Sequence, residues 1–281
     1  MTIRDWQASA AKRLETSGDA DGAYDARLFL SAVTKIPLTN LRLEGGRELT
    51  AEQLSALESM LVRREAGEPE QYIEGEAWFM GLPFTVDPRA LIPRQDTETL
   101  CEEALAAIRK TPAPRVLDLC TGSGALAVAI KVNRPDASVT ASDISPDALA
   151  LAESNARRHG AEVAFILSDG LTDIEGSFGL VVCNPPYLTQ EDMDALMREV
   201  RREPSLALYG GEDGLMFYRR FARELKEHLT ADAVILFEVG AGQAEDVKRI
   251  FTENYPEAEV TSVKDLNGID RVVRIRRSYG R

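Results

Sequence analysis

The stretch from Phe178 to Tyr187 constrains the fold of this chain most, because an apolar strand there ends in Asn184-Pro185-Pro186-Tyr187. The run before Asn184 is typical of a strand buried on both faces in a parallel sheet. Two prolines cannot continue the strand, since each lacks a ladder donor and Pro185 also forces Asn184 into an extended conformation. We therefore expect Asn184 at the carboxyl end of the strand, the edge at which open α/β sheets bind ligands.

The tetrapeptide offers two hydrogen-bond acceptors at a fixed separation, the Asn184 side-chain oxygen and the Pro185 carbonyl. Together they can accept both hydrogens of one planar NH2 group. Such a nitrogen is a poor nucleophile, so its orientation toward an electrophile and the stabilisation of its developing positive charge must supply much of the rate. Tyr187 is predicted to stack on the planar group or to wall it off. Because four-residue motifs recur by chance, a rigid proline turn capped by Asn184 is the alternative interpretation.

Length and composition limit the class of protein. A chain of 281 residues is long enough for one large and one small domain. It has no long uncharged apolar run and no basic leader, so we expect a cytoplasmic protein without a membrane segment. Its three cysteines, Cys101, Cys120 and Cys183, lie in apolar surroundings and are interpreted as reduced thiols. With only two histidines, hydrolytic triads and histidine-based metal sites are not expected, and we predict no metal.

The net charge of −13 opposes attraction to a nucleic acid backbone. We therefore expect a protein partner and no direct binding of nucleic acid. Three clustered arginines, Arg198, Arg201 and Arg202, are interpreted as a solvated face, which is what local charge runs usually form.

The pattern of apolar residues divides the chain into three parts. Residues 1–71 show helical spacing, with a capping box from Thr50 to Gln53, and predict a small N-terminal helical domain. Residues 72–95 change to a β-hairpin pattern around Gly81 and are expected to link two domains. Residues 96–281 alternate helix and strand. This alternation predicts an α/β domain with a doubly wound, Rossmann-like sheet.

Seven strands are expected in that sheet, most of them parallel, with an antiparallel edge hairpin turning at Asn267-Gly268. They are Arg115–Cys120, Ser138–Asp143, Glu162–Leu167, Leu180–Asn184, Ala233–Val239, Glu259–Lys264 and Arg271–Ile275. The first and fourth strands should be neighbours at the switch point of the sheet.

A glycine loop, Cys120-Thr121-Gly122-Ser123-Gly124, follows the first strand. Gly122 would allow a sharp turn and Gly124 the close approach of a ligand. Asp143 ends the next strand, where a carboxylate can accept both hydroxyls of an adenosine ribose. By themselves these features fit a nicotinamide or flavin dinucleotide as well as S-adenosylmethionine.

Asp118 separates these possibilities. A carboxylate before the glycines suits the ammonium of a bound amino acid and would repel a pyrophosphate, which favours S-adenosylmethionine. Asp169-Gly170 follows the third strand, where class I methyltransferases meet the adenine, although a turn or helix cap explains Asp169 equally well. The glycine loop and the tetrapeptide would face each other across the switch point of the sheet. A nitrogen held at Asn184 could then attack a sulfonium methyl in line.

Motifs along nearly the whole chain resemble the PrmC/HemK family, the peptide-chain release factor glutamine N5-methyltransferases. The motifs are Tyr72-Ile73-Glu74-Gly75-Glu76, Gly81-Leu82-Pro83-Phe84, Leu91-Ile92-Pro93-Arg94, Asp96-Thr97-Glu98, Asn184-Pro185-Pro186-Tyr187, Gly210-Gly211-Glu212-Asp213-Gly214-Leu215 and Lys264-Asp265-Leu266-Asn267-Gly268-Ile269-Asp270-Arg271. The resemblance implies a class I Rossmann-like methyltransferase domain and a helical domain that grips the release factor. The resemblance also implies that the methylated residue is the glutamine of the release factor's Gly-Gly-Gln motif.

The resemblance also implies roles for residues of this chain. Asn184, Pro185, Pro186 and Tyr187 would hold the glutamine amide, with Asn184 and Pro185 acting in catalysis. Cofactor contacts would come from Asp118, Cys120, Thr121, Gly122, Ser123, Gly124, Asp143, Asp169, Gly170 and Asn184. Two departures stand out, since Cys120 replaces a frequent glycine and Gln95 a frequent proline. The second leaves the roles of Arg94 and Thr97 open.

Three alternatives accompany this prediction. A related family methylates a ribosomal-protein glutamine with the same tetrapeptide, although the Asp96-Thr97-Glu98 and Gly210 to Leu215 segments favour release factors. An adenine-N6 methyltransferase would need a base-flipping pocket and a basic track, which the acidic composition disfavours. The third alternative is a scaffold that binds the cofactor without turnover.

Overall fold

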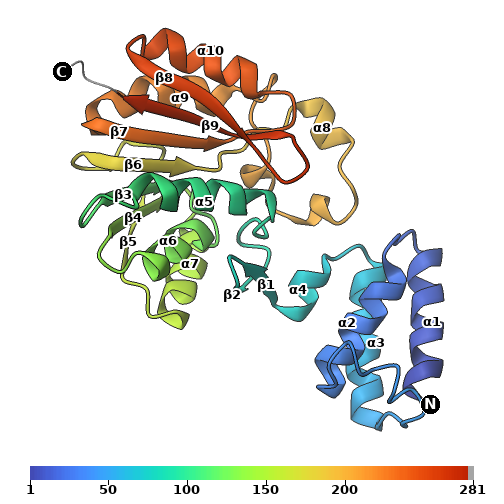
Figure 1. Cartoon of the computed structure of the whole chain (residues 1–281). Coiled ribbons are helices and arrows are strands. Elements are labelled where there is room, and N and C mark those ends of the chain that lie inside the picture. Colours follow the sequence, from blue (N-terminus) through green and yellow to red (C-terminus); the bar gives the residue numbers. More distant parts are fainter. Residues whose placement is uncertain (278–281) are drawn as a thin grey trace. The chain divides into compact units, whose positions relative to one another are not determined.

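The computed structural model describes residues 1–277, and the chain divides into two compact units (Figure 1). The helical unit consists of Met1–Gly75 together with Met197–Arg202, and the sheet unit of Glu76–Leu196 with the residues from Glu203 onward. The chain therefore crosses between the units three times. The last four residues of the predicted domain 96–281 lie outside the described part.

The helical unit is a small bundle around a core that includes Trp6, Phe29 and Leu57. Its helices are α1 (Ile3–Thr16), α2 (Gly22–Thr34), α3 (Ala51–Glu65) and α4 (Glu70–Glu74). The predicted capping box is present at the start of α3, where the Gln53 N–H donates to the Thr50 hydroxyl at 3.2 Å and the Thr50 N–H donates to the Gln53 side chain at 3.1 Å. Such a cap satisfies donors that the first helical turn leaves unpaired.

The segment Met197–Arg202 belongs to this bundle although it lies far along the chain. Arg198 donates to the Ser17 carbonyl at 2.5 Å and Arg202 to the Ala66 carbonyl at 2.7 Å. Carbonyls at helix ends lack intrahelical partners, and arginine side chains can satisfy them. The interpretation of this arginine cluster as a solvated face was therefore wrong for Arg198, which is half-buried, whereas Arg202 is exposed although it donates to a carbonyl.

The predicted hairpin is formed by β1 (Glu76–Phe79) and β2 (Leu82–Thr85). Met80 and Gly81, between the strands, both have positive φ, as hairpin turns that follow the strand twist require. Phe79 and Phe84 are buried in the same core cluster as helix α5 (Asp96–Ile108), which places the hairpin in the sheet unit.

The sheet has seven strands in the order β5-β4-β3-β6-β7-β9-β8. The first five in this order are parallel, whereas β9 is antiparallel to both β7 and β8. The strands are β3 (Arg115–Leu119), β4 (Ser138–Asp143), β5 (Val163–Leu167), β6 (Phe178–Cys183), β7 (Leu229–Glu238), β8 (Ala258–Lys264) and β9 (Asp270–Arg277). The predicted fold class is confirmed, including the antiparallel edge and the pairing of the first and fourth predicted strands.

Helices cover both faces of this sheet (Figure 1). Alternate strand residues enter different core clusters, because side chains along a strand point to opposite faces. Leu117 and Val181 pack with α9 (Met216–Glu224) and α10 (Ala244–Asn254), whereas Val116 and Val182 pack with α5 and α6 (Ala125–Asn133). The remaining helices are α7 (Pro146–Arg158) and α8 (Gln190–Asp194), with short 3-10 turns η1 (Val200–Arg202), η2 (Ser205–Ala207) and η3 (Leu225–His228).

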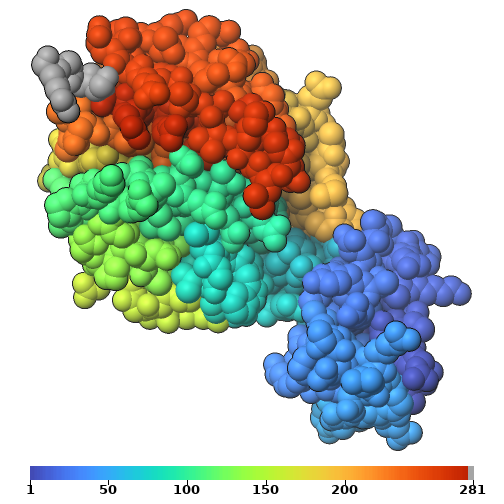
Figure 2. Space-filling view, in the orientation of Figure 1, coloured from blue at the N-terminus to red at the C-terminus, as the bar shows by residue number. Residues whose placement is uncertain are grey.

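The antiparallel edge is joined to α5 at the surface of the sheet unit. Figure 2 shows the red C-terminal strands lying against the green of α5, and two ion pairs connect them, Arg271–Asp96 at 3.0 Å and Arg274–Glu103 at 3.1 Å. In residues 1–277, no helix combines the length and apolar character needed to cross a membrane.

Candidate functional site

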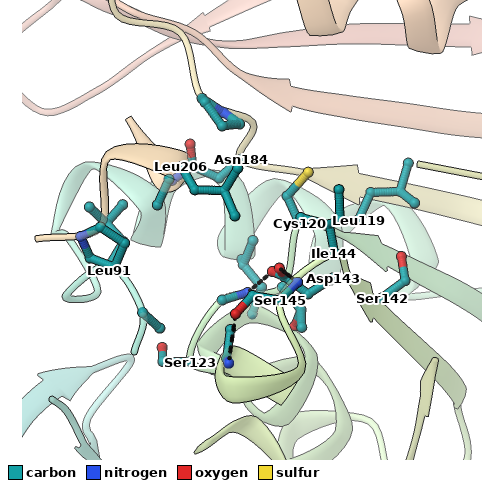
Figure 3. Close-up of a pocket in the computed structure, with 18 of the residues that line it drawn as sticks. Leu91, Leu119, Cys120, Ser123, Ser142, Asp143, Ile144, Ser145, Asn184 and Leu206 are labelled. Carbon is teal, nitrogen blue, oxygen red and sulfur yellow. Dashed lines mark hydrogen bonds between the residues drawn. The ribbon is translucent and has the colours of Figure 1, made fainter. Parts of the chain in front are cut away.

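A cavity of about 300 Å³ lies at the carboxyl edge of the central strands. In Figure 3, Asn184 and Asp143 face the same space from the ends of two different strands. The predicted site residues on its wall are Cys120, Thr121, Gly122, Ser123, Asp143, Asp169, Gly170, Asn184 and Pro186. Asp118, Gly124, Pro185 and Tyr187 are also described but are not among the residues that line the cavity. The fold therefore brings the glycine loop and the tetrapeptide to one cavity.

Asp143 is the acid best placed to meet a ligand. Its Oδ2 accepts from the Gly122 N–H at 2.8 Å and its Oδ1 from the Ser145 N–H at 2.9 Å. Burial raises the pKa of Asp143, and these backbone donors counteract the rise. Each carboxylate oxygen has a further lone pair, so the group can also accept the two hydroxyls of a ribose.

Asp118 lies beneath the glycine loop rather than in the cavity. Its Oδ2 accepts from the Thr121 hydroxyl at 2.6 Å and from the Ala127 N–H at 3.2 Å. Its Oδ1 is buried without a hydrogen-bond partner, and burial raises the pKa of the group to about 7. These contacts hold the loop on the start of α6, while the predicted contact with a ligand ammonium stays a prediction.

The loop backbone follows a left-handed path. Cys120 has φ +58° and Gly122 φ +56°, a region that costs a non-glycine residue about 1–2 kcal/mol. Cys120 thus adopts a backbone conformation that favours glycine. Gly124 has a different constraint, since an added Cβ would lie 2.9 Å from the Cβ of Ala152 in α7. The structure therefore explains Gly124 by helix packing, and the close approach of a ligand remains a prediction there.

Asp169 and Gly170 line a second part of the cavity with Arg220 of α9. The Asp169 side chain is 60% exposed, and its Oδ1 accepts from Arg220 at 2.5 Å. Nearby, Ile144 and Met216 line the cavity although each remains about half exposed to solvent. Exposed apolar side chains around a cleft are typical of a surface that a planar ligand covers. Arg220 and Met216 were not predicted from the sequence.

Asn184 occupies the opposite wall. Its Nδ2 donates to the Thr97 hydroxyl at 3.2 Å, which leaves its Oδ1 as an acceptor. Gly210 and Gly214 support the tetrapeptide from behind, since an added Cβ would lie 2.6 Å from the Pro186 carbonyl oxygen and 2.3 Å from that of Tyr187. Only glycines allow this approach, which explains the Gly210 to Leu215 motif by backbone packing.

Two buried glutamates near the cavity escaped the sequence analysis. Glu203 accepts from the Ile92 N–H at 3.0 Å and pairs with Arg94, both of which lie on the cavity wall. Glu238 ends β7 and is 2% exposed. A sequence signal existed for Glu238, because it is a lone acid after the apolar run from Ala233 to Phe237. No comparable signal marked Glu203.

The residues present fit S-adenosylmethionine. The Asp143 carboxylate is available for ribose hydroxyls, the loop is bare of bulky side chains, and apolar surface flanks Asp169 where the base would lie. Within residues 1–277, no group of three or more His, Cys, Asp or Glu side chains is arranged to hold a metal ion.

Comparison with known proteins gives the family. Residues 98–212 match the "Methyltransferase small domain" model and residues 5–75 the "PrmC N-terminal domain" model. The release factor glutamine methyltransferase of Deinococcus radiodurans is 39% identical over 280 residues, covering 100% of both chains. The chain belongs to the release factor glutamine methyltransferase family. The Geobacter sulfurreducens member of this family is 42% identical and covers 90% of each chain.

A solved structure agrees on the fold. A methyltransferase from Pyrococcus furiosus has a TM-score of 0.53 at 13% identity, over 82% of this chain and 100% of that one. At this identity the likeness concerns the fold alone. Family membership makes the chain a protein-glutamine methyltransferase, so the alternatives of an adenine-N6 methyltransferase and of a non-catalytic scaffold are not needed.

Proposed function

We propose that the chain transfers a methyl group from S-adenosylmethionine to the N5 side-chain nitrogen of the glutamine in the Gly-Gly-Gln motif of peptide-chain release factors. One observation carries the proposal: Asn184, whose Nδ2 donates to Thr97, lines the cavity that is also lined by the glycine loop and Asp143. The names of full-length relatives support the substrate.

Bound S-adenosylmethionine supplies an electrophilic methyl group on a sulfonium. Asp143 would accept the ribose hydroxyls, and the loop from Cys120 to Gly124 would leave room for the amino-acid portion. The apolar surface near Asp169 and Ile144 would hold the adenine. These contacts fix the position of the methyl group relative to Asn184 without participating in bond formation.

The tetrapeptide orients the nucleophile. Asn184 Oδ1 and the Pro185 carbonyl accept the two amide hydrogens, so the nitrogen faces the methyl group and its developing positive charge is stabilised by two acceptors. The N-methylated amide then loses one proton to water or to a backbone acceptor. No residue in this proposal has to remove a proton before transfer, and no metal takes part.

The partner in this proposal is a class I release factor, bound with help from the helical domain of residues 1–71. A protein that modifies a translation factor works in the cytoplasm, and it needs no direct contact with nucleic acid or membrane.

The test is incorporation of labelled methyl groups into purified release factor, compared with a release factor whose Gly-Gly-Gln glutamine is replaced. Labelling of only the native protein is expected. Asn184→Ala should abolish labelling while binding of the release factor is retained, whereas Asp143→Ala should weaken cofactor binding by at least tenfold, because about 1.5–3 kcal/mol accompanies a hydrogen bond to a charged group. Label that enters a ribosomal protein instead of release factor would overturn the substrate assignment.

A further inference from the structure

We propose that Glu238 is a positioning residue for methyl transfer, holding Asn184 through the Thr97 hydroxyl and contacting Tyr187 directly. This inference rests on the proposed function, since it concerns how the tetrapeptide is oriented for its substrate. Glu238 does not line the cavity, whereas Thr97 and Asn184 do.

The position of Glu238 follows from the strand register. Cys183 of β6 pairs with Phe237 of β7, so Asn184 and Glu238 are the next residues of two neighbouring parallel strands. Glu238 is buried, and its Oε2 has no hydrogen-bond partner. A buried carboxylate without full pairing is costly, so packing alone does not account for an acid at this position.

The hydrogen bonds between these residues have a defined direction. Asn184 Nδ2 donates to the Thr97 oxygen at 3.2 Å, and the Thr97 hydroxyl lies close enough to the Glu238 carboxyl to lower the pKa of that group. A threonine hydroxyl has one hydrogen, which an ionised Glu238 can only accept. The Thr97 oxygen therefore faces Asn184 as an acceptor. This arrangement keeps the Nδ2 of Asn184 away from the substrate and directs its Oδ1 toward it.

A second contact reaches the other end of the tetrapeptide. The Tyr187 hydroxyl donates to Glu238 Oε1 over a long 3.4 Å, and the Tyr218 hydroxyl donates to the Glu238 backbone carbonyl at 2.8 Å. One carboxylate thus connects the first and last residues of Asn184-Pro185-Pro186-Tyr187, while Tyr218 fixes the backbone that carries it.

Burial and the charged groups around Glu238 together determine its pKa. Burial is the largest effect and raises the pKa of Glu238, with a smaller contribution from Asp96 on α5. The Thr97 and Tyr187 hydroxyls and Arg271 on β9 lower the pKa, and the net result is a pKa of about 7. Arg271 itself forms ion pairs with Asp96 at 3.0 Å and with Asp265 at 3.1 Å. The charge of Arg94 lowers the pKa of Tyr187. Once protonated, Glu238 can donate to Thr97, which frees the Thr97 hydrogen to face Asn184. That arrangement favours the flipped amide, with Nδ2 toward the substrate.

The experiment compares steady-state methylation of release factor by wild type, Glu238→Gln, Thr97→Val and Thr97→Ser. We expect kcat to fall about 10- to 100-fold in Glu238→Gln and Thr97→Val, the scale of a misoriented reacting group. KM for release factor and the Kd of S-adenosylhomocysteine should stay within about twofold. Thr97→Ser, which keeps the hydroxyl, should retain most of kcat. The double variant Glu238→Gln/Thr97→Val should lose no more than either single variant, because both break one network.

The pH profile supplies a readout that a merely structural role would not change. Wild-type kcat should fall as pH drops below about 7, and this fall should disappear in Glu238→Gln. Glu103→Gln, the same change at a surface ion pair of α5, serves as the control with unchanged kcat.

Two results would overturn the inference: variants that keep wild-type kcat and pH profile, or a loss of kcat that only parallels losses of thermal stability and cofactor affinity. Failure of the proposed function is a separate outcome, because it appears as absence of release factor methylation by the wild-type protein.

Discussion

Buried carboxylates with few partners are concentrated around the site. Asp118 is fully buried, has one unpaired oxygen and a pKa raised to about 7 by burial. Its ionised form is therefore less favourable in the folded protein than in the unfolded chain, whose pKa is near 3.8. The stability contributed by the protonated group is present below pH 4 and is lost as pH rises to about 7.

Asp118→Asn should remove this dependence. The amide oxygen can still accept from Thr121 and Ala127, but it does not ionise. From pH 4 to 7 the stability of wild type should fall relative to the variant, by about 1.4 kcal/mol per pH unit at most. Urea denaturation across this range measures the difference. Asp136→Asn is the control, because Arg134 lowers the pKa of that exposed carboxyl to about 2 and the trend should be absent.

At the level of single residues, the sequence predicted the groups that follow strand ends. Asp143 and Asn184 were located because parallel strands present their carboxyl ends at one edge. Glu203 escaped because its role depends on Ile92 and Arg94, more than a hundred residues earlier in the chain. Asp118 was located correctly on its strand, but only the structure shows that its side chain points beneath the loop.

Two irregular segments meet over the cavity. Residues 89–94 precede α5, and residues 203–207 include the short turn η2; both contribute to the cavity wall. Glu203 joins them, since its side chain is 1% exposed and holds both the Ile92 N–H and Arg94. Loops of this kind have few contacts of their own, so one buried side chain that bonds to both segments can determine their position.

Glu203→Ala should weaken the contact between residues 89–94 and residues 203–207 at the cavity wall. The Ile92 N–H and the Arg94 guanidinium lose their acceptor, and about 1.5–3 kcal/mol accompanies each hydrogen bond of this charged type. We expect the Kd for S-adenosylhomocysteine, measured by calorimetry, to rise about tenfold or more. Arg94→Ala is the matched variant, because Arg94 is 38% exposed and its removal leaves the bond to Ile92 intact. Equal weakening by both variants would locate the effect in the guanidinium rather than in the tie to Ile92.

At the level of elements, regular structure was predictable and its connections were not. The seven strands and the capped helix α3 follow from hydrophobic period and turn residues. The segment Met197–Arg202 has no period, and its return to the helical unit depends on carbonyls that only the folded bundle presents.

Within the helical unit, Arg64 connects distant parts of the chain. Its buried guanidinium pairs with Asp19 at 3.0 Å, Asp25 at 2.6 Å and Glu199 at 2.9 Å. Glu199 belongs to the returning segment, so a single cation holds α3, the α2 region and that segment together. Burial raises the pKa of Asp25 to about 6 despite the ion pair with Arg64.

Arg64→Met should destabilise the helical unit by about 3–5 kcal/mol, because it leaves buried carboxylates without their cation. Trp6 is buried in this unit, and Trp78→Phe removes the other tryptophan, so fluorescence during denaturation reports the helical unit by itself. Arg63→Met is the control, since the Arg63 side chain is 42% exposed, against 8% for Arg64, and a half-exposed pair such as Arg63–Glu68 should contribute about 1 kcal/mol or less. Similar losses in both variants would contradict a central role for Arg64.

The return of residues 197–202 to the helical unit has a consequence for inheritance. A gene segment encoding only residues 1–75 carries an incomplete bundle, and one encoding only the remainder carries a stretch whose hydrogen-bond acceptors are missing. Recombination that exchanges the helical unit between relatives must therefore replace two separate stretches of the gene at once. Residues 1–75 and 197–202 are therefore expected to diverge together, even though the rest of the chain lies between them.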